Sequence, residues 1–432
     1  MDTIFSSASS YLKSAIKIIR VSGKESSNIP YILSYKPTKP RLASFRKLYD
    51  LEKKLIDKAI VIYFPGPNTV TGEDLYEIHI HGSLIIERKI YDILNVQENF
   101  RIAEPGEFTK RAFFNGIIDL TQAEGLNDLI NSETQGQLNL SMSQYEGELS
   151  KKLNFWREEI IFLLSKLEAI IDFSDEELPP NLEKVFTSKT LHLLTEMKRA
   201  VKSSSFGERL RNGFVITLIG RPNVGKSSLI NFLSNRNISI VTNEPGTTRD
   251  IIEVLLDLDG FPVLLNDTAG IRETDSKIEK IGIKKALNTA KNSDIVILLS
   301  DNDNFTMPNL KLSQKIIYVH TKMDLKKKKI NNAHQISIKN NTGIDELVNM
   351  ITKHFHSLSP RENAYLTQQR HIQGVKKAVL ALQRLTKVNL NNNPELVAED
   401  LRVAATSIGS ITNIIDVEEI LDDIFNSFCI GK

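Results

Sequence analysis

A glycine-rich stretch at residues 220–227, GRPNVGKS, has the residue types and spacing needed to hold a nucleotide phosphate. Gly220 and Gly225 allow the tight backbone path that points successive N–H groups at an anion. Lys226 can reach the terminal phosphates, and the Ser227 hydroxyl can ligate Mg²⁺. An apolar run precedes the stretch and a helical pattern follows it, so the phosphates would lie at a helix N-terminus. The pattern predicts a phosphate-binding loop and not a chance glycine turn.

Two later segments supply the residues that would sense a third phosphate. Residues 246–250, GTTRD, lie between the helix of the loop and an expected strand at 251–258. There the Thr248 hydroxyl can complete the Mg²⁺ shell while the segment closes over the γ-phosphate. An apolar strand then ends in Asp267-Thr-Ala-Gly270. Asp267 would hold Mg²⁺ through water, and the Gly270 N–H would contact the γ-phosphate.

Two further segments would recognise the base of the nucleotide. The expected strand at 315–320 ends in Thr321-Lys-Met-Asp324, in the place of a guanine-reading N-K-x-D. The Asp324 carboxylate can accept both N1–H and N2–H of guanine, and adenine has no such donor pair. Ser337–Lys339 lies where a backbone N–H would meet guanine O6. The pattern indicates GTP; ATP is the alternative, supported only by Thr321, which we expect to lower GTP affinity relative to asparagine.

The predicted GTP-binding residues come from the loop, the two phosphate-sensing segments and the base-reading segments: Asn223, Val224, Gly225, Lys226, Ser227, Ser228, Thr242, Asn243, Glu244, Pro245, Gly246, Thr247, Thr248, Asp267, Thr268, Ala269, Gly270, Thr321, Lys322, Met323, Asp324, Ser337, Ile338 and Lys339. In Ras-like enzymes a glutamine after D-x-x-G orients the attacking water, but Ile271 stands there and cannot hydrogen-bond. Glu279 is a candidate replacement, and a surface helix carboxylate is the alternative. The catalytic candidates are therefore Glu279, Lys226 and Thr248, and the Mg²⁺ ligands are Ser227 and Thr248.

The elements that position these residues are flanked by two other regions. Residues 1–118 look mixed α/β, with strands expected at 15–21, 59–64 and 75–81. The last strand alternates, with Glu77, His79 and His81 on its polar face. That face has the donors of a metal site, although a solvated sheet face is the alternative reading.

Helical patterns lie on both sides of the nucleotide-binding region. Thr121 and Glu124 match a capping box. A helix is expected over 187–201, with Ser203–Ser205 leading on to the strand before the loop. Asn393 and Pro394 look like an N-cap and first helical residue. Apolar seams favour a single helical domain with an α/β unit inserted into it, and they comprise Leu138, Met142, Tyr145, Leu149, Leu153, Trp156, Ile160, Leu163, Leu167, Ile170, Val375, Val379, Leu382, Leu385, Val397, Leu401, Ala404 and Ile408.

The amino-acid composition is typical of a globular protein. The 432 residues are 41% apolar and 25% charged with a formal net charge of +2, which suits two or three globular domains. The low net charge argues against bulk coating of nucleic acid. No apolar run approaches the ~20 residues that cross a bilayer. The single cysteine, Cys429, rules out an internal disulfide and fits a reducing cytoplasm, where we expect the protein to act.

These motifs resemble the MnmE (TrmE) family of tRNA-modification GTPases. The resemblance rests on RPNVGKS at 221–227, DTAGIR at 267–272, RIAEPGEFT at 101–109 and the terminal FCIGK at 428–432, and runs nearly end to end. It implies a multidomain α/β and all-α fold. The expected domains are an N-terminal folate-binding and dimerisation domain (1–118), a discontinuous helical domain (119–212 and 360–432) and an inserted P-loop, Ras-like G domain (213–359).

The resemblance also implies a function. Members work with the FAD-containing partner MnmG to add a carboxymethylaminomethyl-type group to C5 of the wobble uridine of certain tRNAs. Hydrolysis follows K⁺-dependent pairing of G domains in a homodimer. By similarity, Asn223, Thr242, Glu244 and Thr247 would ligate K⁺, and Glu279 would orient the attacking water.

A formyl- or methylene-tetrahydrofolate would meet Arg20, Glu77 and Lys432, whereas Ile117 stands where a basic contact is expected. Bound FAD would enter only through the partner. Two alternatives are a ribosome-assembly or RNA-chaperone GTPase, which would usually carry a basic RNA-binding module after the G domain, and a folate-binding scaffold with a weakened GTPase.

Overall fold

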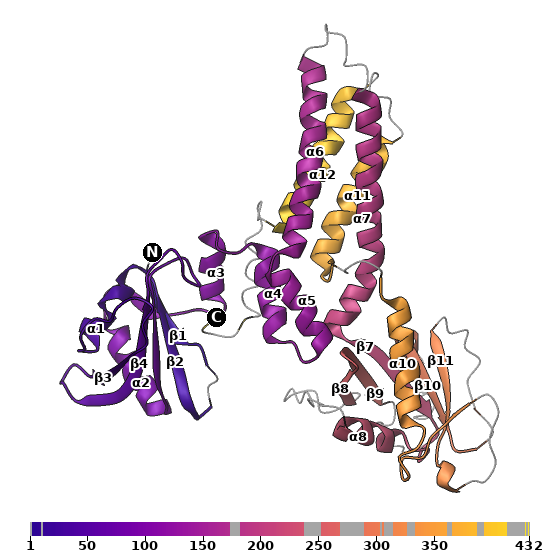
Figure 1. The fold of residues 1–432 in the computed structure, drawn as a ribbon, viewed down its shortest axis with the longest axis horizontal. Coiled ribbons are helices and arrows are strands. Elements are labelled where there is room, and N and C mark those ends of the chain that lie inside the picture. The colour runs from indigo at the N-terminus through magenta and orange to yellow at the C-terminus, as the bar shows by residue number, and fades with distance from the viewer. Residues whose placement is uncertain are drawn as a thin grey trace, which may run out of the picture. The chain divides into compact units, whose positions relative to one another are not determined.

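The computed structural model describes residues 2–9, 12–172, 182–236, 252–267, 289–302, 305, 314–325, 333–360, 365–386, 393–412, 428 and 431. The chain forms two compact units (Figure 1): Met1–Asn127 together with Gly409–Lys432, and Asp128–Ile408. No helix in the described part of the chain is long and apolar enough to cross a membrane.

The first unit is built on a six-stranded sheet in the order β3-β4-β5-β2-β1-β6. All neighbours are antiparallel except β1 and β6. Its elements are β1 (Thr3–Ser7), β2 (Ser14–Ser22), a 3₁₀ helix (Lys24–Asn28), α1 (Ile29–Ile32), β3 (Ser44–Tyr49), β4 (Leu55–Phe64), β5 (Leu75–Gly82), α2 (Leu84–Asn95), β6 (Phe100–Ile102), α3 (Glu107–Phe114) and most of α4 (Leu120–Ile130).

The predicted alternation of β5 is confirmed. Tyr76, Ile78 and Ile80 are buried and belong to one core with Ile90 of α2. The intervening side chains face the other side of the sheet, since successive strand residues point to opposite faces. The sheet therefore has one face covered by α2, while on the other face Phe108 of α3 packs with Ile4 of β1.

The second unit contains a six-stranded, mostly parallel sheet in the order β12-β11-β10-β7-β9-β8, in which only β8 is antiparallel to its neighbour. The strands are β7 (Phe214–Gly220), β8 (Ile252–Leu258), β9 (Phe261–Asp267), β10 (Ile295–Ser300), β11 (Lys315–His320) and β12 (His334–Gln335), with α8 (Lys226–Arg236), a 3₁₀ turn (Met323–Leu325) and α10 (Ile344–Leu358). The predicted α/β unit is confirmed. The central strand β10 is buried along its whole length, as expected for a parallel strand covered on both faces.

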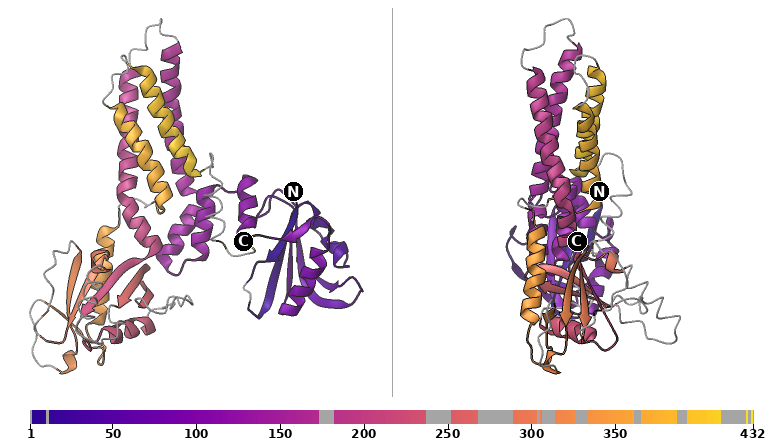
Figure 2. Two further views of the ribbon diagram at one scale, coloured as in Figure 1. Left: turned by 180° about the vertical axis from the view of Figure 1, so that it is seen from behind. Right: turned by 90° about the vertical axis from the view of Figure 1, so that its right-hand side faces the viewer.

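Long helices form the rest of the second unit: α5 (Gln135–Tyr145), α6 (Glu148–Asp172), α7 (Leu182–Asn212), α11 (Gln369–Leu385) and α12 (Pro394–Thr412). The last four run side by side as a column (Figure 2). The seam residues Leu153, Trp156 and Ile160 are buried, as are those of α11 and α12. The side chain of Ile170 lies outside the described residues. Leu138, Met142 and Tyr145 on α5 remain more than a third exposed, because the helix ends before Leu149 and does not extend their seam.

Two local predictions were wrong. Helix α7 continues through Ser203–Ser205, because the Ser203 and Ser204 hydroxyls donate to the carbonyls of Ala200 and Val201 in the preceding turn instead of breaking the helix. Helix α4 begins before Thr121, so Thr121 and Glu124 do not cap it. Asp119 accepts from the Gln122 N–H at 3.0 Å, and Gln122 Oε1 accepts from the Asp119 N–H at 3.1 Å. This reciprocal pair satisfies the free N–H groups at the helix start.

Candidate nucleotide site and N-terminal polar cluster

The loop at 220–227 has the backbone that phosphate binding requires. A Cβ on Gly220 would lie 2.6 Å from the Leu299 carbonyl oxygen, so the strand end accepts no side chain there. Asn223 (φ 59°) and Gly225 (φ 107°) both adopt left-handed conformations that turn the chain into α8. Buried Lys226 places Nζ 2.8 Å from the Gly220 carbonyl and 3.0 Å from the Arg221 carbonyl. Its ammonium group thus lies inside the concave loop, where an anion would meet it.

The sheet register brings the predicted motifs to one edge. Leu218 of β7 pairs with Asp267 at the end of β9, and Gly220 pairs with Leu299 of β10. Ser300 in turn pairs with His320, the residue before Thr321. Because ligands of parallel α/β sheets bind at the carboxyl ends of strands, this edge is where a nucleotide would lie.

The two base-reading segments contact each other. The Ser337 hydroxyl donates to Asp324 Oδ1 at 2.8 Å, and Ser337 Oγ accepts from the Asn340 N–H at 3.2 Å. This leaves the other Asp324 oxygen for a guanine, and Asp324 is exposed. Lys322 makes an ion pair with Asp301 at 2.9 Å.

Thr321 joins the base-reading segment to the phosphate loop. Its buried hydroxyl donates to the Val224 carbonyl at 2.7 Å, and its N–H donates to the Ser300 carbonyl at 2.8 Å. A threonine here therefore still ties the loop to the end of β11. The sequence alone did not predict this bond, which depends on how closely β11 approaches the loop.

The phosphate-sensing residues lie outside the described residues. The structure describes the backbone of Asp267 but not its side chain, and Lys432 is also outside the described residues. The other predicted residues in this class are Thr242, Asn243, Glu244, Pro245, Gly246, Thr247, Thr248, Thr268, Ala269, Gly270 and Glu279.

In the N-terminal unit, Arg20 and Glu77 lie opposite each other on β2 and β5. Arg20 NH2 is 2.9 Å from Glu77 Oε1, and the guanidinium lies over the Phe108 ring at 5.8 Å. His79 Nε2 is 3.4 Å from Glu77 Oε2. Two of the three predicted folate contacts are thus brought together, and Ile117 is 42% exposed beside Gly72.

The histidines of β5 do not share a site. His81 Nδ1 is 2.7 Å from Asp57 Oδ1, whereas His79 contacts Glu77. No group of three metal-ligating side chains occurs within the described ranges. The two histidines thus contact different carboxylates and do not converge on one point.

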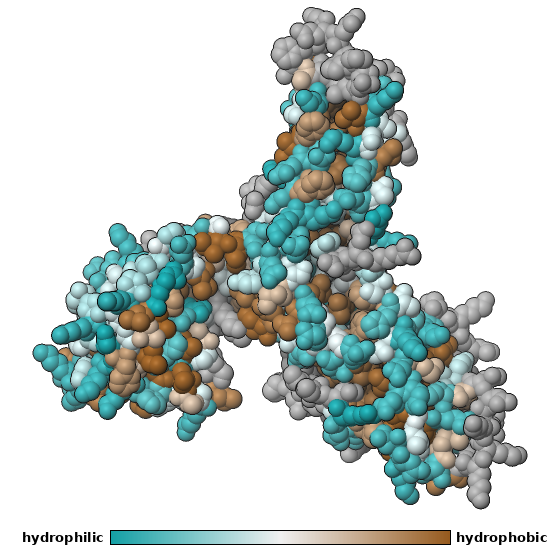
Figure 3. Space-filling view, in the orientation of Figure 1, coloured by the Kyte–Doolittle hydropathy of each residue, from teal (hydrophilic) through white to brown (hydrophobic). Residues whose placement is uncertain are grey.

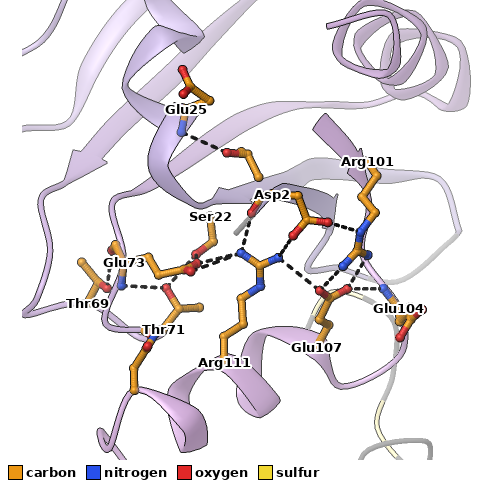
Figure 4. Close-up of polar contacts among 12 residues, drawn as sticks. Asp2, Ser22, Glu25, Thr69, Thr71, Glu73, Arg101, Glu104, Glu107 and Arg111 are labelled. Carbon is orange, nitrogen blue, oxygen red and sulfur yellow. Dashed lines mark hydrogen bonds and ion pairs between the residues drawn. The ribbon is translucent and has the colours of Figure 1, made fainter. Parts of the chain in front are cut away.

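A polar cluster that the sequence did not predict links the N-terminal motifs (Figure 4). Arg111 donates to Asp2 at 2.8 Å, to Glu73 at 3.0 Å and to Glu107 at 3.2 Å. Arg101 also pairs with Asp2 and Glu107. Ser22 of β2 and Thr71 of the loop between β4 and β5 join at 2.7 Å, and Ser22 donates to Glu73 at 2.8 Å.

These contacts change the ionisation of the carboxyl groups. Burial by itself would raise the pKa of Glu107, but hydrogen bonds from Arg101 and the Glu104 N–H, with the charges of both arginines, hold that pKa below its ordinary value. The pKa of Asp2 is lowered in the same way, against its own burial. The cluster is a folded, ionised network of motif residues, and it fixes the loop that carries Thr71 and Glu73.

The C-terminal tail belongs to this same unit. Phe428 packs with Leu120 and Ala123. Gly431 lies so close to β1 that a Cβ would be 1.9 Å from the Ser7 carbonyl oxygen. The tail thus reaches the end of β1. The close approach at Ser7 explains why the terminal motif at 428–432 has a glycine at position 431.

A phosphate loop after the central strand, with guanine-reading segments on the same sheet edge, defines a P-loop GTPase that carries a second α/β unit and a helical column. Two family models match the chain: "GTP-binding protein TrmE N-terminus" over residues 3–117 and "MnmE helical domain" over residues 120–429. The chain belongs to the MnmE family of tRNA modification GTPases and is a GTP hydrolase.

Relatives match over the full length. The tRNA modification GTPase MnmE of Rickettsia akari (strain Hartford) is 41% identical over 450 residues, covering 100% of both chains. That of Rickettsia bellii (strain RML369-C) is 42% identical over 449 residues, again covering 100% of both. Among solved structures, the G domain of the T. maritima FeoB iron transporter is 25% identical over 34% of this chain and 99% of its own, with a TM-score of 0.26.

Proposed function

We propose that this GTPase acts in the cytoplasm with an MnmG-type FAD protein to add a carboxymethylaminomethyl-type group to C5 of the wobble uridine of certain tRNAs. The proposal is supported by 41% and 42% sequence identity, over the full length of the chain, with two proteins named tRNA modification GTPases. The single observation that carries it is the edge where the loop and the base-reading segments meet: Lys226 lies against the Gly220 carbonyl, Thr321 bonds the Val224 carbonyl and Ser337 bonds Asp324.

Wobble nucleosides measured by mass spectrometry test this function. A strain lacking the protein should accumulate unmodified uridine, and expression of the intact chain should restore the modified base. A Ser227→Ala variant should fail to restore it, because the Mg²⁺ ligand is lost. Normal wobble uridines in the deletion strain would remove the proposal.

GTP turnover, in this proposal, depends on groups around the phosphates. Lys226 would neutralise the terminal phosphates, and Ser227 with Thr248 would hold Mg²⁺, which stabilises charge on the phosphoryl group. Asp267 would hold the same ion through water. Asp324, steadied by the Ser337 hydroxyl, would select guanine. Glu279 would orient the attacking water, since Ile271 cannot.

K⁺ would be recruited beside the phosphates by Asn223, with Thr242, Glu244 and Thr247 as further ligands. Asn223 is exposed in a left-handed turn at the mouth of the loop, which leaves its amide oxygen available to a cation. Turnover should be faster in K⁺ than in Na⁺ buffer, and Asn223→Ala should remove the difference. Equal rates in the two buffers would sink the K⁺ assignment.

A tetrahydrofolate one-carbon donor would bind beside Arg20 and Glu77. The pair is half-buried, and a carboxylate there suits the amino and ring N–H groups of a pterin. Lys432 would supply positive charge from the tail, whose Gly431 lies against β1. Calorimetric titration with formyl-tetrahydrofolate should show binding that Glu77→Gln weakens. Unchanged affinity in that variant would place the folate elsewhere.

The chain would work as a homodimer with the domain division expected above: residues 1–118, 119–212 with 360–432, and 213–359. The surface that supports dimerisation is the face of the N-terminal sheet opposite α2, at strands β3 and β4. Phe45 and Ile60, both exposed, pair across β3 and β4 on this face. Apolar side chains also lie among the polar ones on the visible side of the N-terminal unit (Figure 3).

A further inference from the structure

The hairpin of β8 and β9 joins the nucleotide edge of the sheet to helix α5, which packs on α6 and α7 of the helical column. Its register is continuous from Ile252 opposite Asp267 to Leu258 opposite Phe261. At the far end is a two-residue turn in which Asp259 (φ 55°) and Gly260 (φ 85°) are both left-handed, as tight hairpin turns require. The Gly260 N–H donates to Asp257 Oδ1 at 2.7 Å, which closes the turn.

This turn docks on the start of helix α5. The Gly136 N–H donates to the Gly260 carbonyl at 3.0 Å. A Cβ on Gly136 would lie 2.4 Å from that oxygen and 2.9 Å from a Leu210 methyl group. The first distance is shorter than real Cβ contacts allow and involves backbone, so the docking needs glycine at this position.

The docked end of α5 is itself held in place. Thr134 and Gln137 form a capping box, with the Gln137 N–H donating to Thr134 Oγ1 at 3.3 Å. Gln137 Nε2 also donates to the Arg211 carbonyl at 2.9 Å, and Arg211 pairs with Asp128 at 2.7 Å. A displaced turn would therefore act on an anchored helix and not on a free chain end.

The other end of the hairpin lies at the sheet edge that carries the phosphate loop. Asp267, its last residue, is level with Leu218 just before the phosphate loop. The two strands lead directly from the segment that carries Thr248 and into the segment that carries Gly270. Seven residues in each strand span roughly 23 Å at ~3.3 Å per residue. Paired backbones make this span one stiff unit.

We propose that the contact between Gly136 and Gly260 couples the nucleotide state to the helical column through the β8–β9 hairpin, with Gly136 as a positioning residue for the GTPase. The inference rests on the nucleotide site proposed above. A shift of the hairpin at its Asp267 end moves the turn against α5, and coupling of this kind is reciprocal. The docking must then favour one nucleotide state over the other.

The test compares Gly136→Ala with Leu138→Ala, a substitution on the exposed side of the same helix. Affinities for GDP and for a non-hydrolysable GTP analogue are measured for the full chain. Gly136→Ala should change the ratio of the two affinities by about 5-fold or more, the lower end of typical allosteric coupling. Leu138→Ala should leave the ratio as it is in the unmodified chain.

Hydrogen exchange at residues 134–138 gives a second measurement that needs no variant. In the unmodified chain, protection of these amides should differ between the two nucleotide states, although none of them belongs to the proposed nucleotide site. Gly136→Ala should abolish the difference, and Gln137→Ala, which removes the bond to Arg211 without a clash, should reduce it.

Equal exchange in both nucleotide states would overturn the inference, as would an unchanged affinity ratio in a folded Gly136→Ala protein. If Gly136→Ala does not fold, the exchange result on the unmodified chain decides. Failure of the nucleotide site itself would look different, because Ser227→Ala would then bind the GTP analogue as well as the unmodified chain does.

Discussion

Thr321 shows how one residue can depart from a motif and still keep its structural contact. The threonine hydroxyl bonds the Val224 carbonyl and so holds the phosphate loop against the base-reading strand. The sequence indicated only that asparagine was missing. A buried carbonyl left without a donor costs about 1–3 kcal/mol, so the hydroxyl and not the residue's bulk should matter.

Thr321→Val should therefore weaken GTP binding by about 5- to 150-fold, the equivalent of 1–3 kcal/mol. Titration with a fluorescent GTP analogue measures it. Thr321→Ser, which keeps the hydroxyl, should bind nearly as tightly as the unmodified chain. Thr321→Asn should bind more tightly than threonine, as the sequence predicts, and an unchanged affinity in that variant would contradict the prediction.

Because of the arginine–carboxylate cluster, the stability of the N-terminal unit should fall at acidic pH. Because the folded pKa of Glu107 lies below its unfolded value, the stabilisation is fully present above the unfolded value of about 4.3 and is lost as pH falls through the folded pKa. Thermal unfolding followed from pH 6 down to about pH 3 should show a falling midpoint.

Glu107→Gln is the matched variant, since it keeps the shape and removes the titrating group. It should be less stable than the unmodified chain at pH 6 and lose less stability on acidification. Parallel curves for the two proteins would mean that Glu107 does not carry the effect.

At the scale of elements, the periodicity of apolar residues predicted which side of a strand or helix faces the core. The alternation in β5 and the seam in α6 both placed the correct residues in the core. Strand β3 was not predicted, because Arg46 and Lys47 interrupt its apolar pattern and its conformation depends on pairing with β4. The extent of α7 was underestimated because serine hydroxyls can either break a helix or bond back to it.

Two adjacent isoleucines in α6 test the seam. Ile160 is fully buried and Ile161 is 39% exposed. Ile160→Ala should lower the free energy of unfolding by about 2–5 kcal/mol, through lost burial and the cavity left behind. Ile161→Ala should cost well under half of that. Urea unfolding measures both, and equal losses would show that α6 does not pack on its predicted face.

At the scale of the whole molecule, the sequence predicted an inserted α/β unit but not the contacts between distant segments. Asp2, Arg101 and Arg111 come together from positions about a hundred residues apart, and Gly136 meets Gly260 across the insertion. No local pattern specifies such pairs, since each depends on the final placement of whole elements. The loop and base-reading motifs of the predicted nucleotide site do lie at one edge, because they follow strand ends that a parallel sheet aligns.

Strand pairing also determines which side chains line the face of the N-terminal sheet opposite α2. Phe45 lies opposite Ile60, Ile60 opposite His79, and His79 opposite Ile18, so one row of side chains crosses four strands. Residues directly opposite share a face. Arg20 and Glu77 lie in the next row of this face, so a partner seated there would also border the candidate folate pair. A second copy of the chain fits the proposed homodimer.

Ile60→Asp should split that dimer, because a charge on the row would have to be buried without a partner. Sedimentation velocity should show a monomer, and K⁺-stimulated turnover should fall, since two G domains would no longer be held together. Ile85→Asp is the control: Ile85 is also exposed but lies on α2, which covers the opposite face of the sheet. A dimer that survives Ile60→Asp with full turnover would place the interface on another surface of the chain.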